Sequence, residues 1–205
     1  MRVLVLLTLA LAACTPDVVS GAYLCGPEKA CPEGQTCNGE FDEASRLQED
    51  TCVLQSLARP FSCTPKIDLE PDDTMAEAYL IEDLGCVSAP FINDGCMLDA
   101  ESADWVTFVA PAVCTAVEVE VRLSFPIAYE GLGFELWDVN ANAKLASDGE
   151  CKSGLDTGRE RRCLDYTLVP GSKYAVKVTP TGDGSCNGSC AYNRYTLSVQ
   201  LATPG

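Results

Sequence analysis

Apolar and polar residues alternate along most of the second half of the chain. In the clearest run, 117–123, valine or leucine at every odd position is separated by Glu118, Glu120 and Arg122. This period of two predicts a strand with one buried and one solvated face. The same pattern recurs at 134–136, 174–178 and 195–201, with turns such as Pro170-Gly171 between the runs. About eight short strands at this spacing predict an all-β chain folded as an antiparallel β-sandwich.

The N-terminus has the pattern of an export signal. Arg2 precedes a largely apolar stretch of eleven residues at 3–13, which is too short to span a bilayer. Its end, Leu11-Ala12-Ala13-Cys14, resembles the lipobox of bacterial lipoproteins. The resemblance implies removal of residues 1–13 as a signal peptide and lipidation of Cys14, which anchors the chain in the cell envelope. An aspartate after the lipidated cysteine retains many lipoproteins in the inner membrane, so Thr15 favours the outer membrane.

The number of cysteines supports lipidation of Cys14 over an ordinary secretory signal. The chain has 13 cysteines, and assigning Cys14 to lipid leaves 13 − 1 = 12, an even number suited to six disulfides in an oxidising compartment. The twelve are Cys25, Cys31, Cys37, Cys52, Cys63, Cys86, Cys96, Cys114, Cys151, Cys163, Cys186 and Cys190.

Residues 25–52 predict a small disulfide-rich module. This segment holds four cysteines among frequent prolines and glycines, and it lacks the large aliphatic residues that a hydrophobic core needs. It resembles the small, loosely EGF-like knots of exported lipoproteins. Four cysteines permit three connectivities, of which we favour Cys25 with Cys37 and Cys31 with Cys52. We expect residues 14–24 to be a tether, 53–64 a linker, and the module a stiff spacer above the membrane, with ligand binding as the alternative.

Composition excludes several classes of function. The chain contains no histidine, which removes histidine bases, histidine-activated nucleophiles and histidine metal sites. Removal of Arg2 with the signal leaves 14 − 1 = 13 basic residues against 30 acidic ones, a net charge of −17. This charge disfavours nucleic acid as a partner and favours cations. We expect no enzyme, although a carboxylate-dependent glycoside hydrolase stays open as an alternative.

Five ordered motifs within residues 65–202 resemble the bacterial pre-peptidase C-terminal domain. They are Glu70-Pro71-Asp72-Asp73-Thr74, Asp104-Trp105-Val106-x-Phe108, Phe134-x-Leu136-x-Asp138, Pro170-Gly171-x-x-Tyr174 and Tyr195-Thr196-Leu197-x-Val199. The resemblance implies a non-catalytic, jelly-roll-like sandwich of about eight strands. The eight cysteines from Cys63 onward are not required by that family.

The same resemblance implies a calcium site, since relatives of this domain bind the ion through these acidic motifs. Carried over to this sequence, the ligands are Glu70, Asp72, Asp73 and Asp104, with Asp99 as a further candidate. Calcium takes six to eight oxygen ligands, many of them carboxylates. The alternative is that Asp104 caps a strand and the segment around Glu70 is a solvated linker.

A second candidate site is cationic. Lys152, Arg159, Arg161 and Arg162 lie between Cys151 and Cys163, and on such an acidic protein they predict a loop that binds an anionic glycan or an acidic protein. Solvation of a charged hairpin is the alternative. Trp105 and Trp137 lie inside strand patterns, so we expect them to line the core rather than to form an exposed sugar platform.

Together these patterns predict a lipid-anchored surface protein whose sandwich binds glycan or an extracellular or outer-membrane protein. The alternative is a structural envelope component that packs against another outer-membrane protein.

The cysteine assignment predicts a mass. A soluble form that starts after Cys14 contains twelve cysteines, so its intact mass should be twelve hydrogens below the fully reduced value. Mass spectrometry with thiol alkylation measures this, and alkylated thiols in the unreduced protein would contradict the six-bridge assignment.

Overall fold

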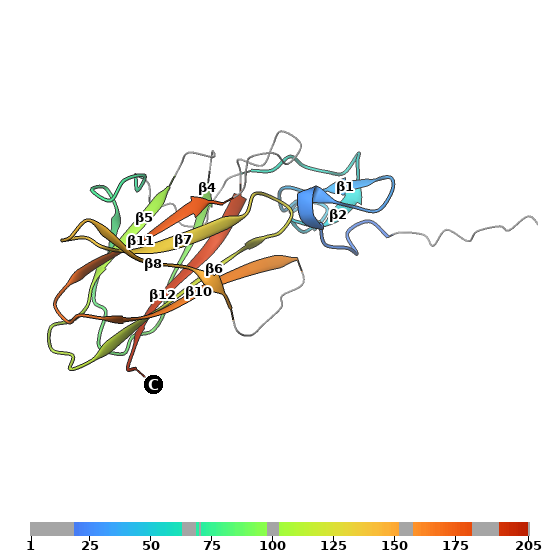
Figure 1. Cartoon of the computed structure of the whole chain (residues 1–205). Helices are drawn as coiled ribbons and strands as arrows, with labels where there is room; N and C mark the ends of the chain where they lie inside the picture. The colour runs from blue at the N-terminus through green and yellow to red at the C-terminus, as the bar shows by residue number, and fades with distance from the viewer. Residues whose placement is uncertain are drawn as a thin grey trace, which may run out of the picture.

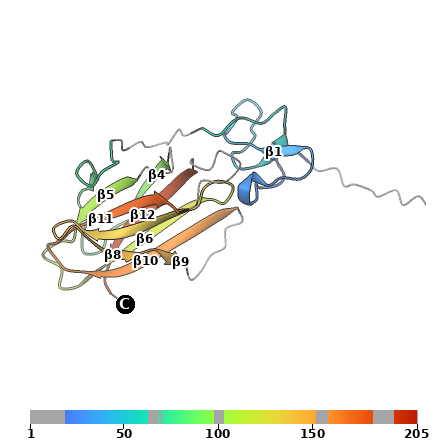
Figure 2. The ribbon, with the colours of Figure 1, turned by 45° about the horizontal axis from the view of Figure 1, so that its top comes forward.

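A computed structural model describes residues 19–62, 69, 71–97, 103–151, 158–181 and 193–204. These residues form a small cysteine-rich module at one end of a sandwich of two five-stranded sheets (Figures 1 and 2). The prediction of an all-β sandwich is confirmed.

The first sheet has the strand order β4-β12-β6-β10-β9, and every neighbouring pair is antiparallel. Its strands are β4 (Phe91–Met97), β12 (Asn193–Ala202), β6 (Val117–Pro126), β10 (Arg159–Leu168) and β9 (Gly149–Glu150).

The second sheet has the order β3-β5-β11-β7-β8. Its strands are β3 (Tyr79–Ile81), β5 (Asp104–Val109), β11 (Lys173–Pro180), β7 (Leu132–Asp138) and β8 (Ala143–Ser147). The short edge strand β3 pairs in parallel with β5, which departs from the antiparallel expectation, whereas the other pairs of this sheet are antiparallel.

The core lies between the sheets and follows the period of two in the sequence. In β6 the residues at 117, 119, 121 and 123 are buried, and in β12 those at 195, 197, 199 and 201 are buried, while the residues between them are partly exposed. The strand register places Val121 opposite Val199 and Leu123 opposite Leu197. Each buried strand face is therefore continuous with its neighbour, and the outward faces of both strands remain polar.

The cysteine-rich module is built from a one-turn 3₁₀ helix, η1 (Pro27–Lys29), and the hairpin strands β1 (Gln35–Cys37) and β2 (Cys52–Leu54). Its two disulfides join Cys25 to Cys37 and Cys31 to Cys52, the connectivity favoured from the sequence. Structure extends beyond 25–52 on both sides: the amide of Gly21 donates to the carbonyl of Cys52, and the amide of Gly39 donates to that of Arg59. We therefore define the module from here on as residues 19–62.

Two further disulfides join pairs of described residues in the sandwich. Cys86 is bonded to Cys114, which ties the segment after β3 to the one before β6, and Cys151 is bonded to Cys163 of β10. Cys96 is also disulfide-bonded. Cys63, Cys186 and Cys190 lie outside the described residues, as does Cys14.

One side chain links the two sheets at the module end of the sandwich. Tyr195 of β12 lies opposite Gly95 of β4, and its hydroxyl donates a hydrogen bond of 2.5 Å to Oδ2 of the buried Asp104 in β5. A Cβ atom at Gly95 would lie 2.2 Å from Cζ of this ring. Glycine at 95 is therefore required for the Tyr195 ring to reach the other sheet.

We predict that Gly95→Ala destabilises the protein by about 1–3 kcal/mol, since the added methyl group must displace the Tyr195 ring. Urea unfolding followed by fluorescence measures this. Gly149→Ala is the control, because a Cβ atom there meets nothing within 4 Å. Equal stability of both variants would contradict the prediction.

Candidate functional site

An open groove of about 850 Å³ lies on the outer face of the first sheet. Its floor contains Arg122 and Ser124 of β6 and Thr196 and Ser198 of β12. These residues point outward because the alternate residues of both strands are buried in the core. The segment 147–151, which leads from β8 into β9, forms one wall. The groove is therefore a direct consequence of the alternating pattern and of the turn between the two sheets.

The groove is lined by hydroxyl groups and by charges of both signs. Besides the floor, its lining includes Arg161, Asp165, Asp148 and Glu150. Arg122 is held in place, since its guanidinium contacts Oδ1 of Asp165 at 2.6 Å and donates to the carbonyl of Leu164 at 3.1 Å. Such a surface suits a polar ligand that makes several directional hydrogen bonds.

The arginines predicted to form one cationic loop are divided by the structure. They belong to β10, so successive side chains point to opposite faces of the sheet. Arg161 lines the groove, whereas Arg162 contacts Glu160 at 2.5 Å and Asp148 at 3.7 Å. Arg159 donates two hydrogen bonds of 3.0 Å to Ser124, one to the side chain and one to the carbonyl. Lys152 lies outside the described residues.

The corner between the two sheets is fixed by Asp148. Its backbone amide donates to the carbonyl of Phe134, and its Oδ1 accepts from the amide of Phe134, both at 3.0 Å. These bonds hold the end of β8 against β7 while the chain continues into β9 of the other sheet. The groove wall is thereby tied to the rigid part of the fold.

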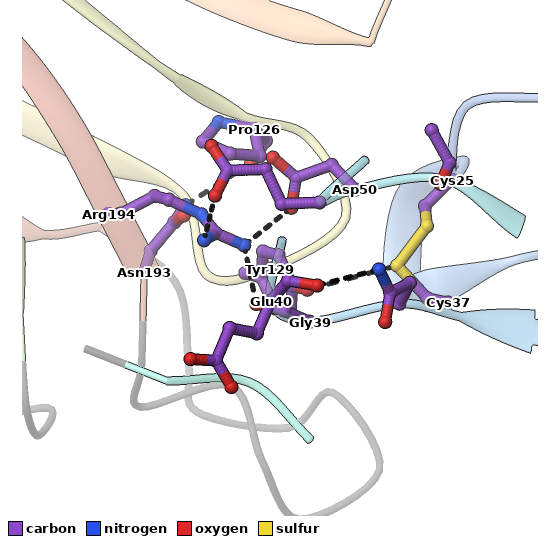
Figure 3. Close-up of polar contacts among 12 residues, drawn as sticks. Cys25, Cys37, Gly39, Glu40, Asp50, Pro126, Tyr129, Asn193 and Arg194 are labelled. Atoms are coloured by element: carbon purple, nitrogen blue, oxygen red, sulfur yellow. Dashed lines mark hydrogen bonds and ion pairs between the residues drawn. A yellow bond between two sulfur atoms is a disulfide. The ribbon is translucent and has the colours of Figure 1, made fainter. Parts of the chain in front are cut away.

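A second charged cluster joins the module to the sandwich (Figure 3). Arg194, in the second position of β12, contacts Glu49 at 2.9 Å and Asp50 at 2.8 Å, and donates to the carbonyl of Gly39 at 2.9 Å. All three partners belong to the module. The side chains of Arg194 and Asp50 are only 17% and 14% exposed, so their contact forms largely away from water, whereas Glu49 is 45% exposed.

Aromatic rings surround the same guanidinium. Its Cζ lies 4.9 Å from the ring centroid of Phe61 and 5.8 Å from that of Tyr129, and the two rings are 4.6 Å apart. Tyr129 and Ala128, from the loop between β6 and β7, share a small buried cluster with Cys25, Cys37 and Cys52. The module thus completes its apolar core with residues of the sandwich.

Burial shapes the ionisation of this joint. It raises the pKa of Asp50, against the opposing charge of Arg194. Burial and the charge of Asp50 raise the pKa of the Tyr129 hydroxyl, and burial lowers the pKa of Arg159 against the charges of Asp50 and Glu49. Arg159, predicted to bind a ligand, therefore lies within the electrostatic reach of the module.

The two tryptophans are close together, on the face of the second sheet opposite the core. Trp105 of β5 and Trp137 of β7 lie edge to face with centroids 5.8 Å apart, and Nζ of Lys177 lies 5.3 Å from the centroid of Trp105. Trp105 is 8% exposed, and Trp137 donates to Glu135 at 3.0 Å. Neither belongs to the main apolar core, and Trp105 offers little open ring surface.

Two of the residues predicted to bind calcium are buried and lie on neighbouring segments. The amide of Trp105 donates to the carbonyl of Asp72 at 2.9 Å, which brings the segment of Asp72 beside Asp104. Asp72 is 3% and Asp104 6% exposed, whereas Asp73 is exposed. Glu70 and Asp99 lie outside the described residues. Within the described ranges, the only close group of three potential ligands is Cys25, Cys31 and Cys52, which are engaged in disulfides.

Comparisons with models of known protein families and with curated proteins found no match. The solved structures that are similar to this chain include three that match over 61% of it. The pre-peptidase C-terminal domain of a Bacillus anthracis collagenase is 16% identical, with 94% of that chain covered and a TM-score of 0.39.

The other two are periplasmic inhibitors of g-type lysozyme, named PliG. The Salmonella Typhimurium protein is 20% identical, with 97% of it covered and a TM-score of 0.40. The Aeromonas hydrophila protein is 14% identical, with 96% covered and a TM-score of 0.36. At such identities and TM-scores these similarities carry no argument about function, and the resemblance to the pre-peptidase domain stays a prediction.

In the part of the chain that the structure describes, no helix is long and apolar enough to cross a membrane.

Sequence reasoning missed the joint between module and sandwich. Arg194 lies outside the cationic run at 152–162, and nothing in its immediate sequence relates it to the module. One signal was present: Tyr129 and Phe61 lie outside the strand patterns, where large aromatic residues need a partner surface.

We predict that Arg194→Ala lowers the stability of the protein by about 3–5 kcal/mol, because it leaves Asp50, whose side chain is only 14% exposed, without its cation in a poorly solvated position. The measurement is urea unfolding, combined with limited proteolysis of residues 19–62. Arg46→Ala is the control, since Arg46 is an exposed arginine of the same module. The prediction fails if the two variants unfold at the same urea concentration.

Proposed function

We propose that this chain is a lipid-anchored envelope protein of a bacterium, and that its sandwich is a non-catalytic domain that binds a glycan or a protein. The observation that carries the proposal is the groove of about 850 Å³ on the first sheet, with its polar lining. Support for the location comes from the lipobox-like Leu11-Ala12-Ala13-Cys14 and from the disulfides, which suit an oxidising compartment.

The chemistry of the groove favours binding over catalysis. Its floor arginine, Arg122, is held by Asp165 and by backbone carbonyls, and its wall residue Asp148 is held by the amide of Phe134. Groups fixed in this way preorganise a surface for recognition, because little side-chain entropy is lost when the ligand arrives.

A screen of glycans and matrix proteins for binding tests the proposed function. A substitution that fills the groove tests whether the ligand binds there. Ser198→Trp places a large ring on the groove floor and should weaken binding of any captured glycan or protein at least about tenfold, equivalent to about 1.4 kcal/mol. Gln200→Trp is the matched control, since it lies two residues further along the same outward face of β12 and does not line the groove.

Equal affinity of the two variants for the ligand would show that the ligand binds outside the groove. Absence of binding across the screen, together with a stoichiometric partner in pull-downs from solubilised membranes, would replace the proposal with a structural role in the envelope.

We further propose that calcium binds near Asp72 and Asp104. The support is chemical: two buried carboxylates on neighbouring segments are oxygen donors of the kind that calcium prefers. When bound, the ion would neutralise charge that burial otherwise disfavours.

If calcium binds there, millimolar calcium raises the melting temperature of the wild-type protein, and the rise is lost in Asp72→Asn and Asp104→Asn. Ligand-linked stabilisation of about 2–3 kcal/mol is expected when calcium exceeds its Kd a hundredfold. Asp83→Asn, in an exposed loop, is the control. An unchanged wild-type melting temperature would eliminate the site.

A further inference from the structure

The module exposes more apolar surface than a solvated spacer requires. Four of its large apolar side chains are Val19, 66% exposed, Tyr23, 50%, Leu54, 48%, and Leu57, 44%. We name these four residues the apolar patch. Single exposed apolar residues are ordinary on protein surfaces, but a group on neighbouring segments indicates an interaction surface.

Backbone contacts place the patch residues on adjoining segments. The amide of Leu54 donates to the hydroxyl of Ser20 at 3.1 Å, and the amide of Leu57 donates to the carbonyl of Leu54 at 2.8 Å. The carbonyl of Tyr23 accepts from the amide of Cys52 at 2.7 Å. Because Cys52 is bonded to Cys31, the segments that carry the patch are held by the knot of the module.

The inference rests on the proposed function, in which Cys14 carries lipid. The apolar patch then lies next to the membrane anchor. Four residues lie between Cys14 and Val19, and the five Cα-to-Cα steps that join them reach roughly 18 Å at most when extended. Val19 therefore stays within roughly 18 Å of the anchored residue, and the sandwich is joined to the module that begins there (Figure 1).

We propose that the apolar patch rests in the interfacial region of the bilayer that holds the lipid anchor. Tyrosine and aliphatic side chains are suited to this region, where one end of the residue meets hydrocarbon and the other meets water. The contact adds a second attachment and fixes the orientation of the module. With the joint at Arg194, it also fixes the direction in which the groove faces.

Charge defines which bilayer the patch fits. Residues 19–62 contain seven acidic and three basic residues, so an anionic lipid surface repels the module. The proposed partner is therefore a zwitterionic surface, and the contact depends on apolar burial rather than on lysines or arginines.

The most exposed apolar residue among those described offers an internal comparison. Val113 is 88% exposed and lies in the connection between β5 and β6, while the module contacts the other end of β6 through Ala128. The length of β6 therefore separates Val113 from the module and from the anchor next to it. Lipid contact at Val113 is therefore not expected.

The test uses the full lipidated chain in phosphatidylcholine vesicles that contain a lipid with a photoreactive diazirine on its acyl chain. After illumination, mass spectrometry locates the lipid adducts. Adducts are expected on residues 19–24 and 53–57 and not around Val113. The double variant Tyr23→Ser/Leu57→Ser should lose most of them, whereas Val113→Ser should keep the wild-type distribution.

Each outcome decides a different point. Failure of the wild-type chain to float with vesicles, as for Cys14→Ser, would overturn the lipid anchor of the proposed function. Flotation without adducts on the patch, or with equal adducts around Val113, would overturn the bilayer contact alone. If the patch gains no adducts in vesicles but is shielded from soluble labels in native membranes, it belongs to a protein partner and the proposal is wrong. The wild-type adduct map suffices for these decisions even if the double variant is destabilised.

Discussion

The guanidinium of Arg194 is the contact on which the arrangement of the two parts depends. Its two carboxylate partners and the carbonyl of Gly39 all lie in the module, while its backbone belongs to the last strand of the sandwich. A largely buried ion pair stabilises only when its remaining hydrogen-bonding groups are also satisfied. The rings of Phe61 and Tyr129 exclude water beside the pair, which makes the contact specific to one orientation.

The module depends on this contact for its core as well. Its described buried cluster contains three cysteines but takes Ala128 and Tyr129 from the sandwich. A segment this small cannot bury enough apolar area by itself, and its disulfides restrict the unfolded chain without supplying that area. The sandwich therefore acts as the second half of the module core, and the two parts form one structural unit rather than beads on a linker.

The fold was predictable because a period of two in a sequence maps directly onto the two faces of a strand. The positions of the arginines at 159–162 were not predictable in the same way, although the same rule applies to them. Residues 159–162 lie between two cysteines and alternate poorly, so the sequence indicated a loop, whereas β10 begins at Arg159 and separates its charges by face. Arg159 also shows why contacts between distant segments are hard to predict from sequence: two of the acidic residues that act on it, Asp50 and Glu49, come from the module, more than 100 residues earlier. The two disulfides of the module have the connectivity that we favoured among the three that four cysteines permit.

The separation of Arg194 from its partners orders the events of assembly. Asp50 precedes it by 144 residues, and the module disulfides close loops of only 12 and 21 residues. In a chain that emerges N-terminus first, the knot can close while most of the sandwich is still absent. The ring faces of Phe61 and Tyr129 that Arg194 covers then lack this partner until β12 inserts between β4 and β6 and delivers Arg194. Docking of the module thus requires the final strand to be in place, and a chain truncated before β12 would expose the same surface to proteases and chaperones.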